Sequence, residues 1–315
     1  MVDILKSFVF HITLLAIIVL VASSSSIARG VECETGPDGA FPPTVNAWEI
    51  AAESQSLKGI CWIGSFPGGG DFDRLHYNGA RDTIVFIPAN VDFSKKVDIV
   101  YWWHGLGGFG QRDFDVRIVP NLKTLMKSRA NFVFIMTEMP WSVNTRTKRK
   151  RQGMAWRGTS EHEQFHVYHE NVLDLLGEKA RECDDTCRIL RLGKTIIIGH
   201  SAGGSTLKSA AKSGSLDIVK PHRIVMSDAS YGNWADVLWE SHVAGSEDVE
   251  FVVLVRYGDS PWKNIKRFIM RFYGMSLPKT LTIHEFRGSD GHTHRSIGDM
   301  SLLWAYSPKN LVVEQ

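Results

Sequence analysis

Short apolar runs alternate with longer amphipathic stretches along most of this 315-residue chain, and this alternation constrains its fold most strongly. A strand that is apolar along its whole length is covered on both faces, as in a parallel sheet. Between the runs the spacing is helical, as in 161–176, where Phe165, Tyr168 and Val172 share one face. The alternation predicts an α/β fold with a mostly parallel central sheet and helices on both faces. The expected strands are 83–87, 98–103, 132–136, 195–198, 224–226, 251–255 and 280–286.

The composition is that of an ordinary folded protein, with 43% hydrophobic, 10% aromatic and 22% charged residues. These values exclude disordered, collagen-like and coiled-coil chains. A formal net charge of +2 gives no indication of nucleic acid as the main partner. Because we find neither a repeat nor a long linker, residues 29–315 are predicted to form a single domain. A basic loop is expected as an insertion at about 141–158.

The first 28 residues have the pattern of a targeting signal. Lys6 precedes an apolar stretch from Phe8 to Ala22, and Ser26 and Ala28 are small residues where signal peptidase recognises its substrates. The stretch is short for a bilayer span of about 20 residues. A cleaved signal peptide, residues 1–28, is therefore favoured over an uncleaved signal anchor, and the mature protein is expected to be secreted or periplasmic, without a stable membrane span.

The four cysteines fit this location, because exported proteins meet oxidising conditions. Four cysteines allow three pairings. We favour Cys33–Cys61 with Cys183–Cys187, since each bond would close a local loop. Buried free thiols are the alternative.

A G-x-S-x-G sequence, residues 199–203, follows the expected strand 195–198 and precedes a helical pattern. Its serine must lie on a sharp turn with strained backbone angles, and small neighbours are needed because larger side chains would collide with the strand and helix. Such a turn exposes the hydroxyl and aims a helix N-terminus at a developing oxyanion. The motif alone is weak evidence, but between a strand and a helix it predicts Ser201 as a nucleophile.

A second glycine-rich turn, His104-Gly105-Leu106-Gly107-Gly108, follows the expected strand 98–103. Such a turn lets a backbone N–H point at the same site and complete an oxyanion hole. The predicted donors are the N–H groups of Leu106 and Ala202.

An activated serine needs a base, and the base needs an acid that orients it. In chain order the acid and then the histidine are expected on loops after later strands. Asp259 follows strand 251–255 and His292 follows strand 280–286, so they are the first choices. His294 is the rival base, and Asp228, after strand 224–226, is the rival acid.

Together these motifs resemble the α/β-hydrolase superfamily, and the serine turn is similar to those of secreted esterases and polyester depolymerases. The resemblance covers roughly residues 84–306 and rests on the motifs at 104–108, 199–204, 258–259 and 291–292. It implies that Ser201 attacks an acyl carbon, that His292 relays the proton, and that Asp259 orients the imidazole.

A competing constellation is His162-Glu163-Gln164-Phe165-His166, a literal H-E-x-x-H sequence. On a helix His162 and His166 would share a face, with Glu163 available as a general base for a zinc-bound water. No motif supplies a third ligand, and the helix falls just before the strand that carries the serine. Half-buried surface histidines are therefore favoured, and no metal is expected.

The sequence thus predicts an exported serine hydrolase that cleaves carboxylic esters through an acyl-enzyme intermediate, without a cofactor. Tryptophans at strand ends and in loops, including Trp141, Trp156 and Trp262, favour a polymeric or wall-associated substrate. The alternatives are a serine peptidase or amidase on the same fold, an H-E-x-x-H zinc hydrolase, and a non-catalytic binding protein.

Overall fold

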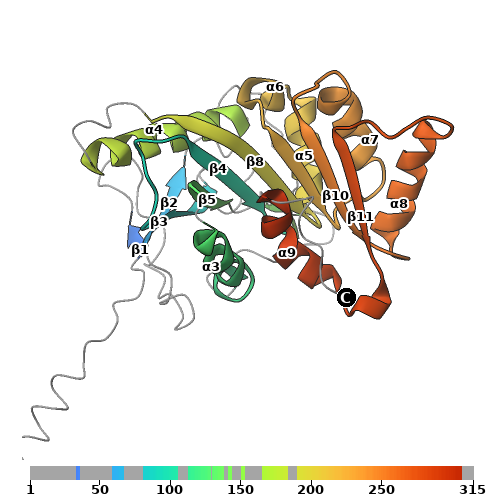
Figure 1. The fold of residues 1–315 in the computed structure, drawn as a ribbon, viewed down its shortest axis with the longest axis horizontal. Helices are drawn as coiled ribbons and strands as arrows, with labels where there is room; N and C mark the ends of the chain where they lie inside the picture. The colour runs from blue at the N-terminus through green and yellow to red at the C-terminus, as the bar shows by residue number, and fades with distance from the viewer. Residues whose placement is uncertain are drawn as a thin grey trace, which may run out of the picture.

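A nine-stranded sheet with the order β1-β2-β3-β5-β4-β8-β9-β10-β11 forms the centre of the molecule (Figure 1). The computed structural model describes residues 33–35, 59–66, 81–105, 113–128, 130–137, 141–143, 150–152, 165–183 and 190–306. The strands of the sheet are β1 Cys33–Thr35, β2 Gly59–Phe66, β3 Arg81–Pro88, β4 Val97–Trp103, β5 Phe132–Thr137, β8 Leu192–His200, β9 Arg223–Ser227, β10 Glu250–Arg256 and β11 Leu281–Phe286.

The sheet is mostly parallel. From β5 through β4, β8, β9 and β10 to β11 every neighbouring pair is parallel, whereas β3 pairs antiparallel with both β2 and β5. Every residue of β5 and of β9 is buried, as a parallel strand covered on both faces requires. The predicted fold class, an α/β fold with a mostly parallel central sheet, is confirmed.

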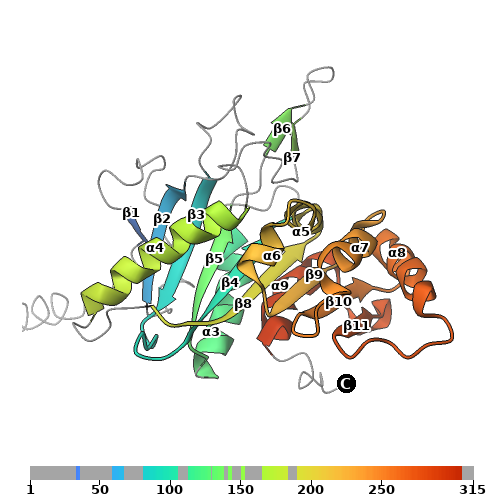
Figure 2. The ribbon, with the colours of Figure 1, turned by 90° about the horizontal axis from the view of Figure 1, so that it is seen from above.

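Helices cover both faces of the sheet, as Figures 1 and 2 show. One apolar cluster joins the sheet to the helices α4 to α8, and a second joins its other face to α3 and α9. Side chains alternate across β4, so that Trp103 belongs to the first cluster and Trp102 to the second, both fully buried. The helices are α3 Val119–Lys127, α4 Phe165–Cys183, α5 Gly203–Lys212, α6 Ser215–Val219, α7 Trp234–Leu238, α8 Ser260–Ile269 and α9 His294–Tyr306.

The basic loop contains a short antiparallel hairpin of β6 (Trp141–Val143) and β7 (Lys150–Gln152). At the edge of the sheet formed by β1, the register of β1 and β2 places Cys33 opposite Cys61. The disulfide between them stays a prediction. The predicted signal peptide and Cys187 lie outside the described residues. Within the described part of the chain, no helix is both long and apolar enough to cross a bilayer.

Candidate active site

Ser201 lies on the turn between β8 and α5 with a φ of 53°, in the left-handed region that residues with a Cβ rarely adopt. The turn is held from both sides. The backbone N–H of Ser201 donates to the carbonyl of Ser227 at the end of β9 (3.1 Å), and the N–H of Gly204 donates to the carbonyl of Ser201 (3.1 Å). A strained backbone angle persists only where surrounding contacts enforce it, and such angles concentrate at functional sites.

Two glycines are required by the close packing around this turn. A Cβ at Gly203 would lie 2.4 Å from the carbonyl oxygen of Trp103, and a Cβ at Gly105 would lie 2.9 Å from the Cβ of Ser201. Gly105, where the described part of the glycine-rich turn after β4 ends, therefore lies directly against the serine side chain.

A histidine and an aspartate form a pair at the same edge of the sheet. Nδ1 of His294, the first residue of α9, lies 2.6 Å from Oδ2 of Asp228. Asp228 follows β9 directly and is buried, whereas the His294 side chain is 39% exposed. The other carboxylate oxygen of Asp228 accepts a hydrogen bond from the backbone N–H of Arg256 (3.2 Å). The aspartate is thus fixed. It binds one ring nitrogen of His294, whose side chain remains partly open to solvent.

The first-choice acid and base from the sequence occupy other surroundings. Asp259 precedes α8, and its carboxylate lies 3.5 Å from Nε of Arg256. The ring of His292 packs edge-on against Phe286 with centroids 4.8 Å apart. The structure therefore brings together the rival residues Asp228 and His294 and places Asp259 and His292 in separate contacts.

The predicted oxyanion donors are described in part. Ala202 directly follows the serine and precedes the first turn of α5, where backbone N–H groups have no intrahelical partner. Leu106 lies outside the described residues, although its neighbour Gly105 contacts the serine as described above.

Tyr231 was not singled out by any sequence motif, yet its side chain lies close enough to that of Ser201 to interact with it. Burial, with the nearby carboxylates of Asp228 and Asp259, raises the pKa of Tyr231, so the phenol is neutral. Its ring packs edge-on against Trp234 at 5.4 Å. A lone tyrosine in a loop carries no spacing signal, so only the fold reveals its position.

His200, the residue before the serine, is a second functional candidate that the motif alone did not indicate. Its ring is buried, and its Nε2 lies 3.0 Å from the carbonyl oxygen of His294. The motif does not specify the residue at this position, so the sequence offered no reason to select it.

The H-E-x-x-H segment is only partly described. His162 and Glu163 lie outside the described residues, and His166, on α4, has its Nδ1 3.3 Å from the hydroxyl of Ser215. Across the described ranges, no group of three or more His, Cys, Asp or Glu side chains is arranged to hold a metal ion.

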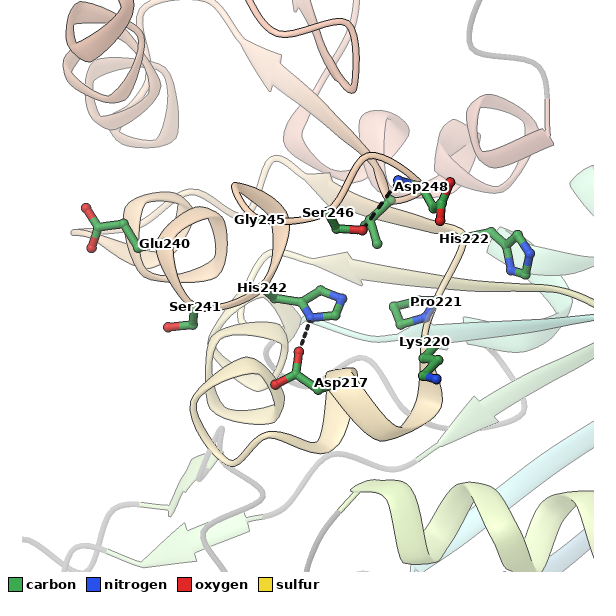
Figure 3. A pocket seen from close by; sticks show the side chains of 11 residues that line it. Asp217, Lys220, Pro221, His222, Glu240, Ser241, His242, Gly245, Ser246 and Asp248 are labelled. Carbon is green, nitrogen blue, oxygen red and sulfur yellow. Dashed lines mark hydrogen bonds and ion pairs between the residues drawn. The ribbon is translucent and has the colours of Figure 1, made fainter.

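A cavity of about 870 Å³ lies elsewhere in the molecule, where the chain enters β9 and β10. His222 precedes β9 and Val249 precedes β10, so the cavity is at the opposite ends of the strands from Ser201. Figure 3 shows the pair of His242 and Asp217 on its wall, with Nδ1 and Oδ1 2.7 Å apart. The cavity is therefore separate from the candidate active site.

No family model matches this chain, and no curated protein matches its sequence. Solved structures share its general shape. The fluorophosphonate-binding serine hydrolase F of Staphylococcus aureus is 13% identical, with a TM-score of 0.47 over 79% of this chain and 98% of its own. A feruloyl esterase module from Clostridium thermocellum is 15% identical, with a TM-score of 0.48 over 87% and 94%.

An S-formylglutathione hydrolase from Agrobacterium tumefaciens is 16% identical, with a TM-score of 0.46 over 82% of this chain and 98% of its own. Similarities at this level do not assign an activity to this chain. The functional argument therefore depends on the geometry of the site.

Proposed function

We propose that this protein is a serine hydrolase that cleaves carboxylic esters, with Ser201 as nucleophile, His294 as general base and acid, and Asp228 as the residue that orients the imidazole. The observation that carries the proposal is the convergence at one edge of the sheet. A serine on a strained turn after β8 lies at this edge together with the half-exposed His294 at the start of α9 and the buried Asp228 at the end of β9, which are hydrogen-bonded to each other.

The chemistry follows from the roles of these groups. His294 takes the proton of the Ser201 hydroxyl through Nε2 as Oγ bonds to the acyl carbon, and Asp228 stabilises the imidazolium through Nδ1–H. The N–H groups of Ala202 and Leu106 stabilise the negative oxygen of the tetrahedral intermediate. The C–O bond then breaks, and His294 returns the proton to the leaving alcohol.

Water completes the cycle. His294 removes a proton from a water molecule that attacks the acyl-enzyme, and it protonates Oγ of Ser201 as the carboxylic acid leaves. Every proton is carried by a residue of this chain, so the proposed reaction needs no cofactor.

The substrate class proposed from the sequence, a polymeric or wall-associated ester, has support in an aromatic pair of an exposed tyrosine and a half-buried tryptophan. Tyr257, 52% exposed just after β10, packs against Trp262 with ring centroids 4.6 Å apart. These residues flank Asp259 in the chain, after β10, and Asp228 follows the neighbouring strand β9. Exposed aromatic rings at the border of a site favour extended apolar or sugar-containing substrates. We also propose export through residues 1–28.

A panel of p-nitrophenyl esters and p-nitroanilides of matched acyl chains tests the reaction class. We expect ester turnover that disappears in Ser201→Ala and no comparable turnover of the anilides. Faster turnover of the anilides would contradict the ester assignment, and equal ester turnover by wild type and Ser201→Ala would contradict the nucleophile.

A further inference from the structure

His200 and His294 are joined by a hydrogen bond whose direction the structure determines. Nε2 of His200 lies 3.0 Å from the carbonyl oxygen of His294 and Nδ1 lies 3.3 Å from Nη2 of Arg117. A carbonyl only accepts and a guanidinium only donates. His200 must therefore carry its proton on Nε2, donate it to His294, and accept a hydrogen bond from Arg117 on Nδ1.

Arg117 is itself fixed in place. It lies in the π-helical turn Phe114–Ile118, is buried, and donates from Nε to Oδ1 of Asp299 on α9 at 2.5 Å. Asn121 donates to the backbone carbonyl of the same Asp299 (2.6 Å). The group that selects the tautomer of His200 is thus anchored to α9, the helix that begins with His294.

The His200 ring is also confined between two surfaces. Its plane is 13° from that of Trp102, with centroids 6.2 Å apart. On α9, a Cβ at Gly298 would lie 2.4 Å from Cδ2 of His200, so only glycine leaves room for the ring. The imidazole therefore has little freedom to turn away from the carbonyl of His294.

We infer that His200 is a positioning residue that sets the separation between the nucleophile and the base. This inference rests on the proposed function of Ser201 and His294. His200 is bonded covalently to Ser201, so its hydrogen bond ties the backbone of the nucleophile turn to the backbone of the base. Asp228 in turn orients the side chain of His294, because its Oδ2 lies 2.6 Å from Nδ1 of the ring. Arg117 acts one step further away, by fixing the tautomer of His200.

The test compares His200→Phe, which keeps a buried ring but cannot donate, with His200→Gln, whose amide can donate to His294 and accept from Arg117. With p-nitrophenyl acetate, we expect His200→Phe to lower kcat by about 10- to 100-fold with KM nearly unchanged, because a misplaced base slows the chemical step. We expect His200→Gln to recover most of the lost kcat. A purely structural role for the ring predicts the reverse order, with Phe better tolerated than Gln.

Arg117→Met provides a second variant that leaves the residue beside Ser201 intact. Its matched control is Arg295→Met, because Arg295 is also near Asp299, at 4.0 Å, but is 53% exposed on α9. We expect kcat to fall in Arg117→Met and to remain at the wild-type level in Arg295→Met, in samples whose thermal melts show that both are folded. If His200→Phe does not fold, this pair and His200→Gln decide the question.

Ser201→Ala separates failure of this inference from failure of the proposed function. If Ser201→Ala is inactive while folded His200→Phe keeps wild-type kcat, the inference is overturned and the proposed function stands. Equal loss of kcat in His200→Phe and His200→Gln also overturns it. If Ser201→Ala turns over like the wild type, the proposed function itself fails.

Discussion

Oδ2 of Asp228 lies 2.6 Å from Nδ1 of His294, although 66 residues separate them in the chain. The aspartate is buried at the end of β9, and the histidine begins the last helix with part of its ring exposed. A buried carboxylate that holds one nitrogen of an imidazole leaves the other nitrogen to exchange protons at the surface.

Replacement of either histidine by alanine distinguishes the two candidates for the base. We expect His294→Ala to lower kcat for a p-nitrophenyl ester by about 10³-fold or more, because no other group would take the serine proton. His292→Ala is the matched control, two residues away and packed against Phe286, and should keep activity within about threefold. Loss of activity in His292→Ala alone would restore the first choice from the sequence.

The two candidate acids are compared in the same way. We expect Asp228→Asn to lower kcat by about 10³- to 10⁴-fold with the fold preserved, because an amide favours the wrong imidazole tautomer. Asp259→Asn should have a small effect, since its carboxylate faces Arg256. Steady-state kinetics and a thermal melt of each variant provide the check, and an active Asp228→Asn enzyme would contradict our assignment.

Gly203→Ala should destabilise the protein through direct collision. The added methyl would lie 2.4 Å from the carbonyl oxygen of Trp103, and overpacking of this kind costs about 1–3 kcal/mol of the free energy of unfolding. Gly245→Ala is the control, because nothing lies within 4 Å of its added Cβ. Urea titrations of both variants measure the difference. Equal stability would show that the chain does not pass this closely to Trp103.

Stability is expected to fall on acidification because of buried neutral histidines. Burial lowers the pKa of His104 and of His169 from the ordinary histidine value of 6.5 to about 4. Between pH 6.5 and 4 the unfolded chain therefore binds more protons, so the stabilisation is complete above pH 6.5 and is lost as the pH falls towards 4. Each histidine contributes a slope of about 1.4 kcal/mol per pH unit within that window.

His169→Gln tests this origin directly, because the glutamine does not titrate but can still bond to the hydroxyl of Tyr101, 2.7 Å from Nδ1 of His169. We expect a shallower dependence of the unfolding free energy on pH between 6.5 and 4, measured by urea titration at several pH values. An unchanged slope would show that His169 is protonated equally in the folded and unfolded states.

The sheet and the serine turn could be predicted because their signals are local. Apolar runs of strand length fall within β3, β4, β5, β8, β9 and β10, and Gly203 of G-x-S-x-G is needed where the chain passes Trp103. Strand β2 was not predicted. Its sequence, GICWIGSF, mixes glycine and serine into a strand near the edge of the sheet, so no continuous apolar run marks it.

The sequence could not decide between the candidate acids or between the candidate bases. Chain order shows which loops carry them, but it does not show where their side chains point. Asp228 has a φ of 45°, and such a turn is not encoded by a motif. His292 and His294 stand two residues apart, and the start of α9 at His294 decides which imidazole meets Asp228. The contact of Tyr231 with Ser201 likewise depends on tertiary packing alone.

Covalent labelling by a fluorophosphonate probe tests the central claim, that Ser201 is activated by His294 and Asp228. We predict rapid labelling of the wild type and of His292→Ala, no labelling of Ser201→Ala, and much slower labelling of His294→Ala and Asp228→Asn. An EDTA-treated wild-type sample should label at the same rate. Labelling that persists in Ser201→Ala, or that is unaffected by His294→Ala, would contradict the account.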